Sequence, residues 1–162
     1  MDHTAKSRNE IDRNMTWDLS RLYADDAQWE KDFAEIDDGV KAFLKFKGRL
    51  AESPETLLAA FQADDELGLV LERLYVYAHL KADEDTGNSA NRARLDRISA
   101  KHAEIGGECA WFQPELIAMD EKVFEHYCNS PVLAFYKRTL DEIGKERKHT
   151  LSAAEERILS MS

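Results

Sequence analysis

Histidines are the residues of this 162-residue chain best suited to hold a metal ion, and there are five of them: His3, His79, His102, His126 and His149. None opens a His-Glu-x-x-His segment, in which one helical face presents two imidazoles and the glutamate acts as a base. His79 and Asp83 are four residues apart and could share a helical face, a spacing typical of a surface contact. His102 falls on an apolar stripe, which indicates a core histidine. His126 and Cys128 are two residues apart and would point in different directions.

The sequence also gives no support for a catalytic nucleophile or a phosphate-binding loop. No Gly-x-Ser-x-Gly elbow is present, and the seven glycines never form a Gly-x-Gly-x-x-Gly segment or a P-loop. Cys109 lies on an apolar stripe, which is typical of a small buried hydrophobe. The carboxylates at 83–85 have no apolar pocket in evidence to shift a pKa, which favours a solvated turn. Tyr75 and Tyr77 cannot face one way on a helix, so at least one belongs to the core or to an interface. We predict no catalytic, cofactor-binding or metal-binding residue in this chain.

The stretch from Asp65 to Asp85 is the most apolar part of the chain. Residues 67, 71, 74 and 78 repeat at helical spacing, and residues 69, 70, 76, 77 and 80 cover much of the remaining circumference. A helix that is apolar nearly all round has neighbours on several sides. We therefore expect a central helix at about 65–83, closed by an acidic turn.

A second long helix is predicted at about 90–112, where apolar positions alternate in threes and fours (95, 98, 102, 105, 109 and 112, counting His102). Two helices that carry such stripes and are joined by a short turn should pair as an antiparallel hairpin. Gly106 and Gly107 weaken the second helix. They mark either a kink or a close helix crossing, and the sequence leaves both open.

Shorter helices are expected on both sides of this hairpin. The first should start at Asp25 or Asp26 and bury residues 29, 33, 36, 40 and 43, with Gly48 near its end. Ser53-Pro54 starts another helix, and the acidic run 64–66 either continues it or caps the central helix anew. Pro114 is expected to interrupt the chain, with a short link at 115–119. Two further helices should begin at Asp120 and at Ser130-Pro131.

The two ends of the chain differ from its middle. Residues 1–14 are polar and predict a flexible leader, whereas 15–23 should tuck against the core through the indole of Trp17. Ser152 and Glu155 form a capping box, and the sequence stops about two turns later. This pattern suggests that the chain is the front portion of something longer. We expect a helical domain at 15–150 and the start of a further helix at 151–162.

Composition bounds the class of protein. Hydrophobic residues make up 43% of the chain, with only seven glycines and three prolines, which favours an all-α fold: an antiparallel helical bundle with the long hairpin at its centre. The net charge of −10 argues against nucleic acid or an anionic membrane as a partner. No apolar run approaches the ~20 residues that span a bilayer, and no secretory signal is visible. Two cysteines form no disulfide framework, so we expect a cytoplasmic protein.

Four segments carry a family resemblance: TWDLSRLY, LERLYVYAHLKADEDTGN, WFQPEL and HTLSAAEERILS. In this order they resemble the amino-terminal region of oligoendopeptidase F, within the thimet-oligopeptidase-like zinc metallopeptidases. The resemblance covers roughly residues 15–162. It implies a mainly helical, two-part metalloendopeptidase that encloses a deep channel and cleaves short peptides.

The resemblance also implies where the chemistry lies. Zinc would be held by His-Glu-x-x-His and a downstream glutamate in a carboxyl-terminal catalytic domain beyond position 162, and would activate water there. No residue of this chain matches those ligands, so zinc is a cofactor of the full-length parent only and the chain alone should be inactive. Its expected partners are that catalytic domain and, through the parent, short peptides.

Two alternatives remain open. A free-standing helical interaction module would have the same fold without any enzyme, and the coding frame beyond Ser162 distinguishes it from the front part of a peptidase. A helical bundle that holds a cofactor would need inward-facing ligands, which we do not find. If the chain is instead the front part of a peptidase, the isolated domain should expose apolar surface where the catalytic domain docks, and this predicts concentration-dependent self-association.

Overall fold

The computed structural model describes residues 10–147, and within them every regular element is a helix. Three long helices are α1 (Asp26–Leu44), α2 (Pro54–Glu84) and α3 (Ser89–Cys109). Three shorter ones are α4 (Phe112–Ala118), α5 (Glu121–Cys128) and α6 (Lys137–Arg147). Short 3-10 turns lie at Arg13–Met15 (η2), Leu19–Arg21 (η3) and Pro131–Tyr136 (η4). The all-α prediction is confirmed.

The described chain forms two compact units that interleave in the sequence. The first unit takes the residues up to Lys41 and those from Asp65 to Glu108, and the second takes Ala42–Asp64 and the residues from Cys109 onward. Two boundaries between the units fall inside α1 and α2, so each of these two helices contributes residues to both units. The expected division into a leader, a domain at 15–150 and a helix from 151 stays a prediction, and residues 1–9 and 148–162 lie outside the described part.

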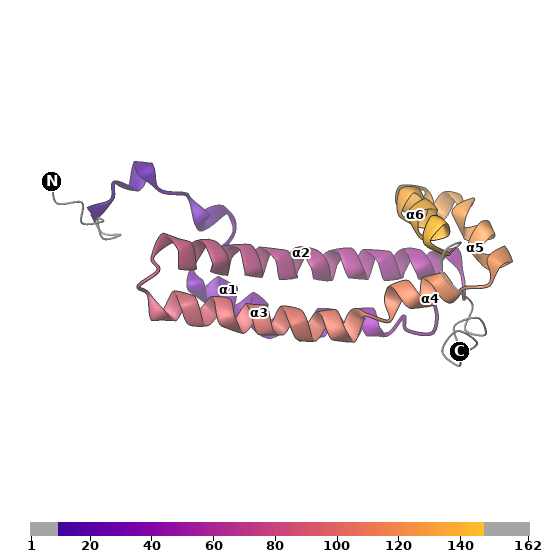
Figure 1. The fold of residues 1–162 in the computed structure, drawn as a ribbon, viewed down its shortest axis with the longest axis horizontal. Coiled ribbons are helices and arrows are strands. Elements are labelled where there is room, and N and C mark those ends of the chain that lie inside the picture. Colours follow the sequence, from indigo (N-terminus) through magenta and orange to yellow (C-terminus); the bar gives the residue numbers. More distant parts are fainter. Residues whose placement is uncertain (1–9, 148–162) are drawn as a thin grey trace, which may run out of the picture. The chain divides into compact units, whose positions relative to one another are not determined.

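In the first unit, α2 and α3 run in opposite directions with α1 beside them (Figure 1). The predicted hairpin is therefore present, and Asp85 forms its turn by accepting a hydrogen bond from the Gly87 amide. The predicted stripe of α2 is buried, with exposed fractions of at most 9% at Leu67, Leu71, Leu74 and Ala78. Gly39 lets α1 approach closely, because a Cβ at this position would lie only 3.3 Å from the Leu67 side chain.

The beginning of α1 follows its sequence signal. Asp25 accepts a hydrogen bond from the Gln28 amide at 2.9 Å, which satisfies one of the unpaired donors at the helix start. The predicted stripe is turned inward: Trp29, Ile36, Val40 and Phe43 are buried, and Phe33 stacks on Trp29. Both the start and the face of this helix are confirmed.

The central helix is longer than predicted. Ser53 accepts from the Thr56 amide and Pro54 takes the first helical position, and the helix then runs without a break to Glu84. The acidic run 64–66 continues this helix and does not cap a new one. The predicted start at 65 was therefore wrong by about three turns, because carboxylates on the outer side of a helix are solvated and need not end it.

The segment around Pro114 also differs from the prediction. α3 ends at Cys109 rather than at 112, and Phe112–Ala118 forms α4 where we expected an interruption and a link. Pro114 lies in the first turn of α4, where amides have no intrahelical acceptor, so the helix loses no hydrogen bond. Gly106 and Gly107 lie inside α3, and a Cβ added at either would meet no group of another described element within 4 Å, so no close helix crossing explains them.

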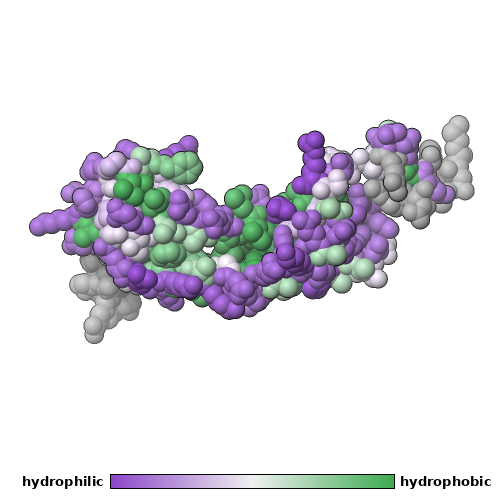
Figure 2. Space-filling model, turned by 180° about the vertical axis from the view of Figure 1, so that it is seen from behind, coloured by the Kyte–Doolittle hydropathy of each residue, from purple (hydrophilic) through white to green (hydrophobic). Residues whose placement is uncertain are grey.

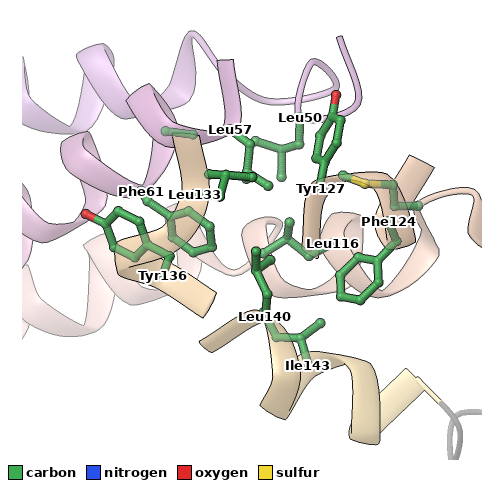
Figure 3. Packing of buried hydrophobic residues seen from close by; sticks show 12 residues of the cluster. Leu50, Leu57, Phe61, Leu116, Phe124, Tyr127, Leu133, Tyr136, Leu140 and Ile143 are labelled. Atoms are coloured by element: carbon green, nitrogen blue, oxygen red, sulfur yellow. The ribbon is translucent and has the colours of Figure 1, made fainter. Parts of the chain in front are cut away.

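The second unit packs α4, α5, η4 and α6 against the start of α2. Figure 3 shows its core, in which aromatic and aliphatic side chains from these elements converge. Phe61 and Tyr136 stack with ring centroids 4.4 Å apart. Asp120 caps α5 through the Lys122 and Val123 amides, as predicted, whereas the helix expected from Ser130 opens as the 3-10 turn η4 before α6.

Arg147 closes this unit. Its guanidinium donates to the carbonyls of Leu116, Ile117 and Met119 at 2.6–2.9 Å, at the end of α4 and just after it, where carbonyls lack the next turn of helix as a donor. It also pairs with Glu121 at 2.8 Å. One cation thus joins the end of α6 to the end of α4 and the start of α5.

Candidate functional site

In the described part of the chain, the residues that could hold a metal do not come together. Within residues 10–147, no group of three or more histidine, cysteine, aspartate or glutamate side chains is arranged to hold a metal ion. Over the same range, no helix is long and apolar enough to cross a membrane.

The predicted histidine contacts have mixed outcomes. His79 Nδ1 lies 3.0 Å from the Asp83 carboxylate with both side chains about half exposed, so this pair is the predicted surface contact. His102 is exposed and lies beside the Tyr75 ring, with centroids 6.2 Å apart. The prediction of a core histidine was therefore wrong. Cys109 is half-buried rather than fully buried.

The face of α3 explains the error at His102. Its buried or nearly buried positions are Arg94, Ile98, Lys101 and Ile105. Ile98 and Ile105 were predicted, whereas Arg94 and Lys101 take the places predicted for residues 95 and 102, one position later. Arg94 pairs with Asp26 at 2.6 Å and Lys101 with Asp37 at 3.1 Å. Long cationic side chains can bury their aliphatic stems while their charges meet carboxylates. A search for apolar residues at helical spacing does not find buried positions that are occupied by arginine or lysine.

A polar network fixes α1 against α2 and α3. Asp26 accepts from the Tyr77 hydroxyl at 2.8 Å through one oxygen and pairs with Arg94 through the other. Burial and the Asp26 carboxylate both raise the pKa of Tyr77. The Arg97 guanidinium forms two bonds of 2.8 Å with Glu30 and lies 4.5 Å from the Phe33 ring centroid. Of the two tyrosines of α2, Tyr77 is in the core and Tyr75 is at the surface, which agrees with the prediction that at least one of them is buried.

The amino-terminal segment is anchored differently from the prediction. Trp17 is 79% exposed, so its indole does not pin the segment, whereas Leu19 and Tyr23 are buried. Arg73 of α2 donates to the Leu22 carbonyl at 3.2 Å and lies 4.7 Å from the centroid of the Tyr23 ring. Burial, together with the nearby Asp32 carboxylate, raises the pKa of Tyr23 to about 12.

An apolar strip remains on the side of α2 that faces away from α1 and α3. It consists of Leu69, Val76 and Leu80, spaced seven and four residues apart, and Leu69 is 67% exposed. Hydrophobic surface also gathers in patches on the face drawn in Figure 2. The prediction that neighbours cover α2 on several sides therefore holds only in part for the described residues.

Comparisons with known proteins show which proteins this chain resembles. The family model described as Oligopeptidase F matches residues 115–162. An oligopeptidase of Bacillus subtilis is 32% identical over 154 residues, which are 94% of this chain and 23% of that protein. The plasmid-encoded oligoendopeptidase F of Lactococcus lactis is 28% identical over 96% of this chain and 26% of its own length. This chain matches the amino-terminal region of oligoendopeptidase F.

Solved structures agree with this match to oligoendopeptidase F. A putative peptidase from Chlamydophila abortus superimposes with a TM-score of 0.84 and 29% identity over 98% of this chain and 27% of its own. Oligoendopeptidase F from Enterococcus faecium gives a TM-score of 0.69 and 30% identity over 83% of this chain and 26% of its own. The chain thus spans about a quarter of the length of its relatives.

Proposed function

We propose that this chain is the non-catalytic amino-terminal domain of a cytoplasmic, zinc-dependent oligoendopeptidase and forms part of the wall of its substrate channel. The observation that carries the proposal is the coverage: 94% of this chain corresponds to only 23% of a related oligopeptidase. In this account the zinc ligands belong to the other three quarters of the protein. When bound there, zinc would polarise the scissile carbonyl and activate water.

The chain's own contribution is shape and rigidity. A wall that limits access to short peptides must hold its surface in place while a substrate is bound. The ion pairs of Arg94 and Lys101 with α1, and the bond from Trp29 to α2, tie three long helices together in the first unit. None of these residues acts on a peptide bond in this account.

The proposal is tested with a chimera in which this chain replaces the matching segment of the Bacillus subtilis relative. We expect the chimera to hydrolyse a short peptide and to lose this activity with a chelator, because the catalytic part supplies the zinc ligands. A second chimera that carries an unrelated helical domain of similar size is the control and should be inactive. A folded chimera of the first kind without hydrolysis would contradict the proposal.

A free-standing interaction module is the second candidate, and the exposed strip on α2 is the observation that favours it. Such a module would bind a separate protein and would not support hydrolysis in the chimera. The two candidates therefore differ in the same experiment.

A further inference from the structure

The apolar strip of α2 lies opposite its core face. Leu67, Leu71, Leu74 and Ala78 are buried, whereas Leu69, Val76 and Leu80 lie roughly half a turn round the helix. From residue 69 to residue 80 the strip extends over about 16 Å of helix axis, at 1.5 Å per residue. That length corresponds to three turns, which is enough to seat one short helix.

Two depressions lie along the strip. The first, of about 440 Å³, is lined by Leu69, Val70 and Val76 of α2 together with Leu22 of the amino-terminal segment. The second, of about 340 Å³, lies beside Leu80 and is lined by Met15, Trp17 and Leu19. Met15 and Trp17 are 80% and 79% exposed. Single exposed hydrophobic residues are ordinary, but a contiguous run of them marks an interaction surface.

The border of the strip is mainly acidic. Glu72 lines the first depression, and Asp83 and Glu84 line the second, where Asp83 also lies beside His79 and Glu84 pairs with Lys81. The one cation among these lining residues is Arg73, which already binds the Leu22 carbonyl and lies over the Tyr23 ring. A surface with an apolar middle and carboxylates at its edge is complementary to a helix that is apolar in the middle and carries lysine or arginine beside it.

The comparisons indicate where such a helix comes from. In the relatives, the matched region is joined to a further segment about three times as long. We propose that the strip of Leu69, Val76 and Leu80 seats an amphipathic helix with a basic edge from that further segment of the same polypeptide. The inference rests on the proposed function and names the surface through which this domain would hold the catalytic part.

Maleimide labelling of a cysteine in the strip tests the proposal. Leu69→Cys is introduced into a background of Cys109→Ser and Cys128→Ser, both in the isolated chain and in the Bacillus subtilis chimera. Leu69 is largely exposed, so the substitution should leave the fold intact. We expect labelling of the folded chimera to be at least tenfold slower than labelling of the dilute isolated chain. The control is Asp38→Cys, whose side chain is 79% exposed on α1, and it should react equally fast in both.

Two outcomes would overturn the proposal. One is equally fast labelling of Leu69→Cys in both proteins. The other is slow labelling already in the dilute isolated chain, which would assign the strip to a second copy. If the chimera does not fold, the isolated chain and the rest of the Bacillus subtilis protein are mixed as separate polypeptides. Slower labelling of Leu69→Cys after mixing supports the proposal. An unchanged labelling rate contradicts it.

The failure of this inference can be distinguished from failure of the proposed function. A chimera that hydrolyses peptide while its cysteine labels fast contradicts only the docking surface. A chimera that protects the cysteine but hydrolyses nothing contradicts only the proposed function.

Discussion

The indole nitrogen of Trp29 donates a hydrogen bond of 2.9 Å to the main-chain carbonyl of Leu74. Both residues are fully buried, and they lie 45 positions apart in the sequence. The bond therefore fixes how α1 sits on the middle of α2, and it does so inside the core, where a lost partner is costly.

Removal of this indole should destabilise the chain strongly. We expect Trp29→Ala to lower the free energy of unfolding by about 3–5 kcal/mol, through the cavity and the lost hydrogen bond. Trp17→Ala is the matched control and should change it by less than about 0.5 kcal/mol, since Trp17 is 79% exposed. Denaturant unfolding followed by circular dichroism measures both, and similar losses in the two variants would contradict the assignment of Trp29 as the anchor.

The pair of Asp26 and Arg94 predicts an asymmetry between two substitutions. Arg94 is buried, so Asp26→Ala leaves a buried charge with few partners, and we expect a loss of about 1–2 kcal/mol because Asp26 itself is half exposed. Arg94→Met removes the buried charge and keeps the apolar stem, so it should cost less. Thermal unfolding compares the two variants. A larger loss for Arg94→Met would show that the charge itself stabilises the fold.

Arg147 should stabilise the second unit through geometry as well as charge. Arg147→Lys keeps the charge, but a lysine cannot present the planar fork that reaches three carbonyls, so we expect it to lose about 1.5–3 kcal/mol of stability. Arg138→Ala, at a side chain that is 91% exposed, should have no measurable effect. Urea denaturation distinguishes the variants, and an Arg147→Lys protein as stable as the parent would refute the capping role.

Alkaline pH should weaken the fold through Tyr23. Its pKa is raised from 10.0 to about 12 in the folded chain, so the folded state keeps a proton that the unfolded state releases. This stabilisation is fully present below pH 10 and is lost as the pH rises from 10 to about 12. Tyr23→Phe should reduce that loss. Urea unfolding at stepped pH values measures the slope, and an equal slope in the variant would be the contrary result.

Self-association of the isolated chain is expected at high concentration, through the strip on α2. Light scattering should show a mass that rises with concentration, and Leu69→Lys should reduce this rise because it places a charge in the strip. Phe135→Lys is the matched control, because Phe135 is 86% exposed but lies in the other unit. Monodisperse monomers at every concentration would count against the prediction.

The sequence predicts those elements whose signals are local. Asp25 and Ser53 cap the starts of α1 and α2, and each accepts a hydrogen bond from the amide three residues later. Pro54 occupies the first turn of α2, as expected. The inner face of α1 follows directly from its apolar spacing. In these cases the same few residues determine both the pattern and the structure.

Other features depend on residues far apart in the sequence. The buried face of α3 includes Arg94 and Lys101, whose partners Asp26 and Asp37 lie more than 60 residues earlier. Trp17 looks like an anchor by type, but Leu19 and Tyr23 occupy the available core positions. The sequence separates the strip from the core stripe of α2 by position, but it does not show that the strip is left uncovered, since both sets are apolar and only the packing partners distinguish them.

Peptide hydrolysis by the purified 162-residue chain tests the central claim most directly. The chain is incubated with zinc and a short peptide, with and without a chelator, and the products are resolved by mass spectrometry. A non-catalytic amino-terminal domain predicts no cleavage in either sample. Cleavage that the chelator abolishes would contradict the account, because it would place the catalytic zinc site within these residues.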